Sequence, residues 1–292
     1  PHDISTFGFS TARYVGTEVV KNLIRDSQTT GRWYLVDTMG RRAGWLTLAI
    51  GMSAGATLAL IPEEFSDDSR LHHIVDVVEG AILKAQVFGR SDGVALLAEG
   101  LSYRLGDVTE LEALIGHKVP LDAAGHPRLS EFPFRELVAK ELRERARARG
   151  QKLEFVTLDL GYELRSADPT PFDLAYCRML GYFGVQLLLD SKRSTTGVMV
   201  AIVNGMLHPI ALSEITDPAT NRIRIRTVDV DSDSYRVARA YMTRLELADL
   251  DDPTMLSKLA ERAKMSPEAF RQRYLRAASR IADGLPASSS PG

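Results

Sequence analysis

The stretch that decides the fold runs from Gly31 to Phe65 and reads GRWYLVDTMGRRAGWLTLAIGMSAGATLALIPEEF. Its first eight residues have the aromatic and β-branched density of a buried strand. Twenty uncharged residues then run from Ala43 to Pro62, with two arginines before them and two glutamates after them. Three interpretations compete: a membrane span, a serine hydrolase elbow, and a buried helix that turns at glycines into a short buried strand ending in acid.

The first two interpretations are the weaker ones. Glycine, serine and threonine dilute the apolarity, and no second candidate span exists, so we predict no membrane association. Gly51-Met-Ser53-Ala-Gly55 has the G-x-S-x-G spelling of an elbow, but only six residues separate it from Pro62. That is too short for the helix an elbow requires, so a serine hydrolase using Ser53 is only a remote alternative. The sequence favours the helix, glycine turn and strand.

Composition narrows the class of protein. The chain has 292 residues, 45% of them hydrophobic and 25% charged, which is typical of a soluble globular protein of one large or two smaller domains. A net charge of -2 gives no reason to expect nucleic acid as a partner. The only cysteine, Cys177, excludes an intrachain disulfide and fits a reducing cytoplasm. The chain begins at Pro1 without a signal peptide or initiator methionine, so we expect a cytoplasmic protein that is longer than this sequence.

Helices and strands are predicted to alternate around the opening stretch. Apolar residues at helical spacing predict helices over 11–27 and 71–88, and strands are expected over 93–100 and 152–161. Such alternation is typical of βαβ units and a mostly parallel sheet. The arginine-rich segment 135–150 reads as a charged, solvated helix.

The second half of the chain carries clear local signals. Thr170-Pro171 predicts the start of a helix with an apolar face. Asn204-Gly205 between apolar runs predicts a hairpin with a type I′ turn. Helices fill the rest, and the small polar tail 284–292 is expected to be disordered.

Chemistry is expected where the first strand ends, at Met39-Gly40-Arg41. Ligands of open α/β sheets bind at the carboxyl ends of strands, and a helix N-terminus favours an anion. Gly40 would let the backbone approach a ligand, and Arg41 offers a forked donor for phosphate. Glu63, at the end of the next strand, would accept from a sugar hydroxyl. The alternative, that these are ordinary surface charges, is left open by spacing alone.

The quoted stretch, together with LGYELRSADPTPFD from Leu160 to Asp173, resembles the phosphofructokinases, in the branch that includes the pyrophosphate-dependent enzymes. The resemblance runs from STFGFSTAR at Ser5 to about Asp190. It implies two similar three-layer, Rossmann-like α/β domains with the site between them. Residues 1–163 would be the fructose 6-phosphate domain, with a helical insertion at about 101–150. Residues 164–292 would be the C-terminal segment of the phosphoryl-donor domain, a helical extension and the tail.

The resemblance assigns roles to seven residues. Met39, Gly40 and Arg41 match the motif that holds fructose 6-phosphate, and Glu63 matches the acid that binds sugar hydroxyls. The other three are Tyr162, Arg165 and Arg32.

Tyr162 stands where the ATP-using branch has histidine. Arg165 matches an arginine that reaches the 6-phosphate or the transferred group, which makes it a candidate stabiliser of the transition state. Arg32 matches an arginine that crosses a subunit interface into a neighbour's site, so a homo-oligomer, dimer or tetramer, is implied. A second interface-crossing arginine would fall at Val156 and is therefore absent or displaced.

The implied reaction is the glycolytic transfer of a phosphoryl group to O1 of fructose 6-phosphate, from pyrophosphate rather than ATP, with Mg²⁺. The family's donor-site glycine motif and its catalytic Thr-Ile-Asp-Asn-Asp loop are expected upstream of Pro1. We therefore predict neither a general base nor a metal ligand within this chain. The alternative is a catalytically inert fragment that binds a sugar phosphate.

Overall fold

The computed structural model describes residues 4–67, 69–105, 108–120, 132–190 and 197–279. The chain divides into two compact units. We call Thr17–Gly161 with Thr227–Gly292 the sheet unit, and Pro1–Gly16 with Tyr162–Arg226 the hairpin unit. Each is described by itself.

A four-stranded parallel sheet is the centre of the sheet unit. Its strands are β1 (Trp33–Thr38), β2 (Leu58–Leu60), β3 (Gly93–Ala98) and β4 (Phe155–Leu160), in the order β2-β3-β1-β4. β1 and β3 are buried almost throughout, as expected for parallel strands covered on both faces. The prediction of an α/β fold with a parallel sheet is confirmed.

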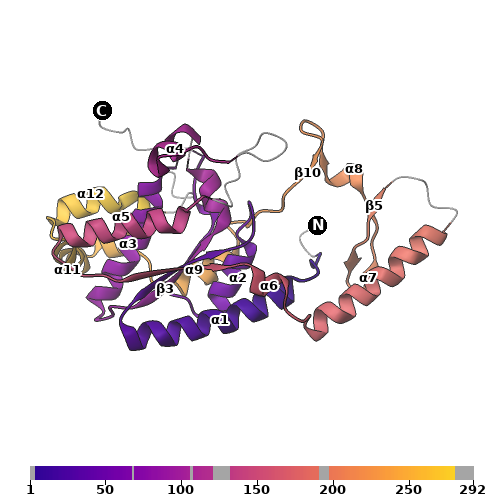
Figure 1. Ribbon diagram of the computed structural model, residues 1–292, viewed down its shortest axis with the longest axis horizontal. Coiled ribbons are helices and arrows are strands. Elements are labelled where there is room, and N and C mark those ends of the chain that lie inside the picture. The colour runs from indigo at the N-terminus through magenta and orange to yellow at the C-terminus, as the bar shows by residue number, and fades with distance from the viewer. Residues whose placement is uncertain (1–3, 68, 106–107, 121–131, 191–196, 280–292) are drawn as a thin grey trace. The chain divides into compact units, whose positions relative to one another are not determined.

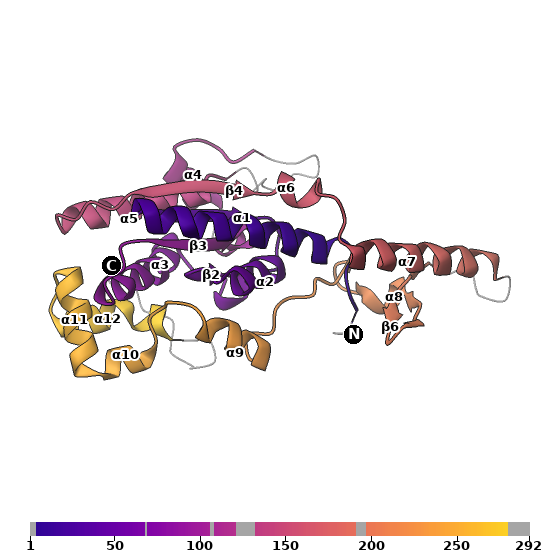
Figure 2. The same ribbon diagram turned by 90° about the horizontal axis from the view of Figure 1, so that it is seen from below.

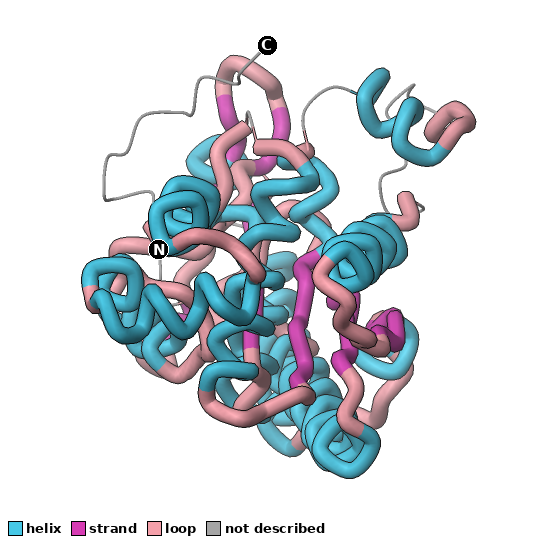
Figure 3. Tube along the Cα trace, turned by 90° about the vertical axis from the view of Figure 1, so that its left-hand side faces the viewer, coloured by secondary structure: helices cyan, strands magenta, loops and turns pink. Residues whose placement is uncertain are grey.

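Helices cover both faces of this sheet (Figure 1; Figure 3). The helices of this unit are α1 (Phe9–Thr30, which begins in the hairpin unit), α2 (Trp45–Ala54), α3 (Leu71–Val87), α4 (Val108–Ile115), α5 (Phe134–Ala148), α9 (Asp233–Ala240), α10 (Leu247–Asp251), α11 (Pro253–Ala263) and α12 (Pro267–Ala278). Of these, α11 and α12 pack on α3 and not directly on the sheet. Two short 3₁₀ helices, Pro62–Glu64 and Glu99–Arg104, follow β2 and β3.

Alternate strand residues show which helices lie on which face. Leu35 on β1 shares a core with α3 and α5 residues such as Val78 and Leu142. Tyr34, the preceding residue, points to the other face and donates from its hydroxyl to Asp26 of α1. The two faces of the sheet are therefore covered by different helices, which gives a three-layer arrangement.

The opening stretch folds as its third interpretation predicts. α2 ends at Gly55, which adopts a left-handed φ of 73°, and the chain then enters β2. Gly51 makes the close packing possible, because a Cβ there would lie 2.6 Å from the Cβ of Ala59. Ser53 lies inside α2 and not on a strand-to-helix turn, so the serine hydrolase alternative is wrong. None of the helices in the described ranges is long and apolar enough to cross a membrane.

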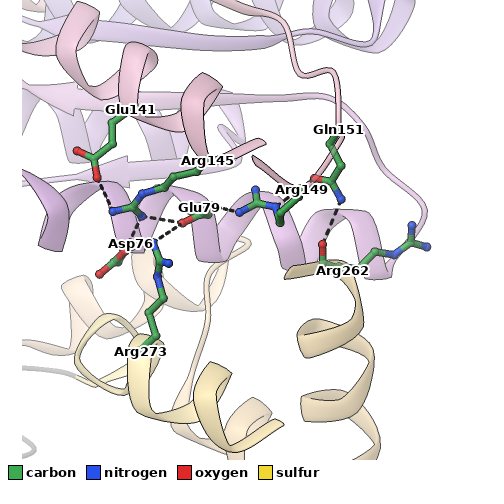
Figure 4. A network of polar contacts seen from close by, with 8 residues as sticks. All are labelled: Asp76, Glu79, Glu141, Arg145, Arg149, Gln151, Arg262 and Arg273. Carbon is green, nitrogen blue, oxygen red and sulfur yellow. Dashed lines mark hydrogen bonds and ion pairs between the residues drawn. The ribbon is translucent and has the colours of Figure 1, made fainter. Parts of the chain in front are cut away.

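The segment 135–150, predicted as a charged, solvated helix, forms α5, which is a layer of the core. The predicted helical insertion at about 101–150 stays a prediction. Phe134, Val138 and Leu142 of α5 are buried. Two of its arginines are also withdrawn from solvent by carboxylates of α3, as Figure 4 shows. The prediction of a wet arginine face is wrong for these two residues, and correct for the exposed Arg147.

The carboxylates of α3 form a buried ion-pair network with α5 and α12 (Figure 4). Arg145 Nη1 lies 2.6 Å from Asp76 Oδ1 and 2.7 Å from Glu79 Oε2. Arg149 pairs with the other oxygen of Glu79, and Arg273 of α12 approaches Glu79 at 3.5 Å. Burial alone would raise the pKa of Glu79, but Arg145 and Arg149 outweigh it and lower that pKa.

The predicted domain boundary near residue 163 lies close to the change of unit at Gly161. Residues 227–292, predicted to belong with the second domain, group instead with the sheet unit. The reason is packing: Leu259, Phe270 and Tyr274 are buried in the same core as Leu35. Figure 2 shows α11 and α12 beside α3.

The hairpin unit contains α6 (Tyr162–Arg165), α7 (Pro171–Leu189), α8 (Leu212–Ile215) and the short strands β5 (Val198–Met199), β6 (Ile202–Val203), β7 (Met206–Leu207), β8 (Ile210–Ala211), β9 (Thr216–Asp217) and β10 (Arg222–Ile223). Thr170 caps α7 as predicted. Asn204 and Gly205 adopt φ values of 51° and 76° between β6 and β7, which confirms the type I′ hairpin. The predicted disorder of 284–292 lies outside the described residues.

A buried carboxylate ties the N-terminal segment to α7 within the hairpin unit. Asp173 accepts hydrogen bonds from the backbone amides of Gly8 and Thr11, both at 2.8 Å, and from the Thr11 hydroxyl. The apolar face predicted for α7 is only partly covered among the described residues: Tyr176 is buried, whereas Phe172 is 51% and Met179 42% exposed. A similar second three-layer domain is thus not present among the described residues and stays a prediction.

Candidate functional site

All four strands of the sheet unit are parallel, so their carboxyl ends meet at one edge. Met39, Gly40 and Arg41 follow β1, Glu63 follows β2, and Glu99 follows β3. We call this the carboxyl edge. It holds four residues with a predicted role, Met39, Gly40, Arg41 and Glu63, together with Glu99.

The loop after β1 is held in an unusual conformation. Arg41 has a φ of 51°, in the left-handed region that non-glycine residues rarely adopt. Gly40 is required by close approach, since a Cβ there would lie 2.8 Å from the Ala43 carbonyl oxygen. Gly100 is required for the same reason, since its Cβ would lie 2.6 Å from the Arg41 carbonyl oxygen. Such local strain concentrates at functional sites.

Glu99 explains how the loop is held, and it was missed by the sequence reasoning. Its Oε2 accepts from the backbone amides of Gly40 and Arg41, at 3.2 and 2.9 Å. The amides that were expected to receive an anion are therefore satisfied by this carboxylate. The Arg41 side chain is exposed, and its predicted contact with a phosphate stays a prediction.

Glu63 caps α2 in this structure. Its carboxylate accepts from the Gly44 amide at 3.0 and 3.2 Å and from the Val228 amide at 2.9 Å. Gly44 permits this approach, because a Cβ there would lie 2.9 Å from Glu63 Oε2 and closer still to Ile61. A carboxylate at a helix N-terminus is stabilised by the helix dipole. Glu63 is half-buried, and its predicted contact with a sugar hydroxyl stays a prediction.

Beneath the loop, Asp37 forms an acidic pair with Asp159. The register of β1 and β4 sets the two side by side. Asp37 Oδ2 lies 3.6 Å from Arg135 Nη1, while its buried Oδ1 has no hydrogen-bond partner in the described part of the chain. Burial raises the pKa of Asp37 to about 7; Arg135 opposes the rise, and Asp159 and Glu99 add to it. Asp37 and Asp159 each stand near the end of an apolar strand, and this pattern in the sequence could have revealed the pair.

Arg32 lies at the other end of β1 from Met39. A strand of six residues spans about 20 Å, so Arg32 is not part of the carboxyl edge of its own chain. Its Nε lies 3.4 Å from Glu154 Oε2. Its predicted role in a neighbouring subunit's site is compatible with this placement and stays a prediction.

Tyr162 and Arg165 belong to the hairpin unit, on α6. Both are exposed, and the Arg165 guanidinium carbon lies 5.1 Å from the centroid of the Tyr162 ring. This stacking gives Arg165 a defined direction relative to its own helix.

The residues described here do not form the magnesium site that the resemblance implies. Across the described ranges, no three His, Cys, Asp or Glu side chains gather as a metal site would require. Asp37 and Asp159 are a pair only, and Arg135 already faces Asp37. We therefore derive no step through a metal ion.

The fold and the carboxyl edge define an α/β protein with an exposed arginine in a strained loop at the ends of parallel strands. The phosphofructokinase family profile matches residues 2–188, so the chain belongs to the phosphofructokinase family.

Two curated relatives match most of the chain. The pyrophosphate–fructose 6-phosphate 1-phosphotransferase of Thermotoga maritima is 47% identical over 274 residues, which cover 94% of this chain and 65% of the relative. The enzyme of the same name from Naegleria fowleri is 41% identical over 283 residues, which cover 94% of this chain and 64% of the relative. This chain thus spans less than two thirds of the length of either relative. The solved structure of phosphofructokinase from Saccharomyces cerevisiae matches 94% of this chain and 28% of its own, at 17% identity and a TM-score of 0.49.

Proposed function

We propose that the whole protein is a pyrophosphate-dependent phosphofructokinase. It transfers a phosphoryl group from pyrophosphate to O1 of fructose 6-phosphate and gives fructose 1,6-bisphosphate in the glycolysis of the cytoplasm. Both relatives carry the name of this reaction, at 47% and 41% identity. The observation that supports a fructose 6-phosphate site is the strained loop at the carboxyl edge, with its exposed Arg41.

In this proposal the described residues hold the acceptor sugar. Arg41 binds the phosphate of fructose 6-phosphate through its planar fork of donors. Glu63 accepts from a sugar hydroxyl through the lone pairs that Gly44 and Val228 leave open. Catalysis of phosphoryl transfer depends on positioning and on electrostatic stabilisation, so rigid placement of the acceptor is a large part of this chain's contribution.

The remaining assigned residues act on the transferred group or from a second copy. Arg165, with Tyr162 against its guanidinium, neutralises the 6-phosphate or the phosphoryl group in flight. Arg32 reaches the site of a neighbouring subunit, which makes the working enzyme a homo-oligomer. The general base, the pyrophosphate site and the Mg²⁺ that neutralises pyrophosphate are proposed to come from sequence beyond these residues.

Calorimetric titration of fructose 6-phosphate into the chain tests the site. Arg41→Ala removes a charge-assisted contact worth about 1.5–3 kcal/mol, so the Kd rises about ten- to a hundredfold. Arg42→Ala is the matched control, because Arg42 is the adjacent arginine and lies 5.2 Å from the Tyr103 ring centroid. It should change the Kd less than threefold. Equal losses in both variants would show a diffuse charge effect and contradict the assignment.

A coupled assay for fructose 1,6-bisphosphate, with pyrophosphate or ATP as donor, tests the reaction on the full-length protein. Product with pyrophosphate supports the proposal, and product with ATP alone corrects the donor. Sugar-phosphate binding without product from either donor would favour the inert binding protein instead.

A further inference from the structure

Residues 227–244 belong to the sheet unit and contact the chain on both sides of β2. We call them the return segment. Near its start, the Val228 amide donates to Glu63 Oε1 at 2.9 Å, just after β2. Near its end, the Thr243 amide donates to the Thr57 carbonyl oxygen at 2.8 Å, just before β2. The return segment therefore supplies one of the donors that hold Glu63 at the carboxyl edge.

Arg244, the last residue of the return segment, forms a buried ion pair with Glu64, the neighbour of Glu63. Its Nη1 lies 2.7 Å from Glu64 Oε2, and the two side chains are 3% and 5% exposed. The other oxygen of Glu64, Oε1, accepts from the Ile61 amide at 3.4 Å, at the start of the 3₁₀ helix that carries Glu63. Glu64 thus links Arg244 to both ends of this short helix.

A small apolar core packs the return segment against the same region. Val228 and Tyr235 of the segment are buried together with Ile61. Burial raises the pKa of Tyr235; the Glu64 carboxylate adds to the rise and Arg244 opposes it, so both charges of the pair lie close to this phenol. Apolar packing and the ion pair therefore act on one region, the 3₁₀ helix that presents Glu63.

We propose that Arg244 is a positioning residue for the acceptor sugar: through Glu64 and the Val228 amide it fixes the carboxylate of Glu63 toward a sugar hydroxyl. This role rests on the proposed function, in which Glu63 accepts from that hydroxyl. Glu63 itself is held by neutral backbone amides, those of Gly44 and Val228. The charge-assisted pair beside it is the stronger contact, and phosphoryl transfer depends on rigid placement of the acceptor.

Amide hydrogen exchange, followed by NMR, tests the positioning without any ligand. Arg244→Gln removes the charge that Glu64 faces, so the Val228 amide should exchange at least about tenfold faster. Arg239→Gln is the matched control, because it makes the same charge change on a buried arginine of the return segment that donates to Glu246 at 2.9 Å. An unchanged rate at Val228 in Arg244→Gln, or an equal increase in the control, would overturn the proposal.

Two further variants separate positioning from loss of folding, which thermal melts of each variant monitor. The pair uses one guanidinium nitrogen, so the ammonium of Arg244→Lys should restore the Val228 exchange rate to within about threefold. A rate as fast as that of Arg244→Gln would contradict the proposal. Where Arg244→Gln does not fold, Arg244→Gln combined with Glu64→Gln replaces it, because it leaves neither charge buried and unpaired. The same faster exchange is expected there.

Calorimetric titration of fructose 6-phosphate into the full-length protein tests the role in binding. Arg244→Gln should raise the Kd about three- to tenfold. In a Glu63→Gln background the same change should alter the Kd less than about twofold, because Arg244 acts through Glu63. In an Arg41→Ala background it should keep its full effect. A full, additive loss in Glu63→Gln would show a general loss of structure and overturn the proposal.

The failure of this role differs from the failure of the proposed function. No fructose 6-phosphate binding by the unsubstituted protein would contradict the proposed function, while the exchange rate of Val228 would still decide whether Arg244 positions Glu63. Binding by the unsubstituted protein with the same Kd in Arg244→Gln would overturn the role of Arg244 alone.

Discussion

Two carboxylates in the sheet unit, Glu79 and Asp37, have opposite pKa shifts. Glu79 on α3 has a side chain that is 1% exposed, and three arginines surround it. Asp37 at the carboxyl edge is 15% exposed, and one arginine faces it, at 3.6 Å. Arginines lower the pKa of Glu79 in spite of burial, whereas burial raises the pKa of Asp37 to about 7.

The difference shows which group serves the fold and which is available for function. In the buried network, arginines of α5 and α12 pair with carboxylates of α3, and these ion pairs join the three helices. Incomplete pairing at the carboxyl edge leaves a carboxyl group that changes its charge near neutral pH, with one oxygen unsatisfied among the described residues. Perturbed carboxyl groups of the second kind are typical of functional sites.

The largest effect is expected where pairing is complete. Glu79→Gln leaves Arg145 and Arg149 buried without their shared counter-charge, and breaking a buried ion pair in this way costs about 3–5 kcal/mol. Urea denaturation at pH 7 measures the lowered free energy of unfolding.

Glu141→Gln is the control for that measurement. Glu141 contacts the same Arg145, at 2.5 Å, but its side chain is 29% exposed. Its loss should cost no more than about 1 kcal/mol, as for a surface pair. Equal losses of unfolding free energy in the two variants would show that the burial of Glu79 does not determine how much the ion-pair network stabilises the fold.

A pH-dependent effect is expected from Asp37. Its folded pKa of about 7 lies above the ordinary value of 3.8, so the folded protein holds this proton more tightly than the unfolded chain. Its contribution therefore lowers the free energy of unfolding as the pH rises from about 4 through 7. From these two pKa values the loss between pH 5 and pH 8 is about 3 kcal/mol.

Asp37→Asn should remove this loss, so that the variant gains relative stability at pH 8 and shows a flatter pH profile. Denaturation at several pH values tests it. Asp67→Asn is the control, because Asp67 pairs with Arg104 while its side chain is 89% exposed. If the slope of the unsubstituted protein persists in Asp37→Asn, another group titrates in this range.

The sequence predicted what periodicity and turn chemistry determine. The order of helix and strand, the glycine turn after α2, the Thr170 cap and the Asn204-Gly205 hairpin all follow from local patterns that the structure retains. The loop at Met39–Arg41 was predicted at the end of β1 for the same reason.

What the sequence did not predict depends on contacts between distant residues. The sequence predicts a solvated Arg145, but α3 brings Glu79, which is 66 residues earlier in the chain, against it. Glu99 satisfies the amides of Gly40 and Arg41 from 59 and 58 residues away. Composition and spacing contain no information about such pairings.

The smallest effect is expected from Arg135, the arginine that faces Asp37 at 3.6 Å. Arg135 is the main group that opposes the rise in the pKa of Asp37. Arg135→Gln should therefore raise that pKa further, by about one unit, which corresponds to about 1.4 kcal/mol. Carboxyl ¹³C NMR titration measures it, with the Asp37 signal identified by its loss in Asp37→Asn. Arg104→Gln, which removes an arginine paired with the exposed Asp67, should leave the Asp37 titration in place. An unmoved pKa in Arg135→Gln would mean that burial and the neighbouring Asp159 set it alone, and that the carboxyl edge is even less paired than the distances suggest.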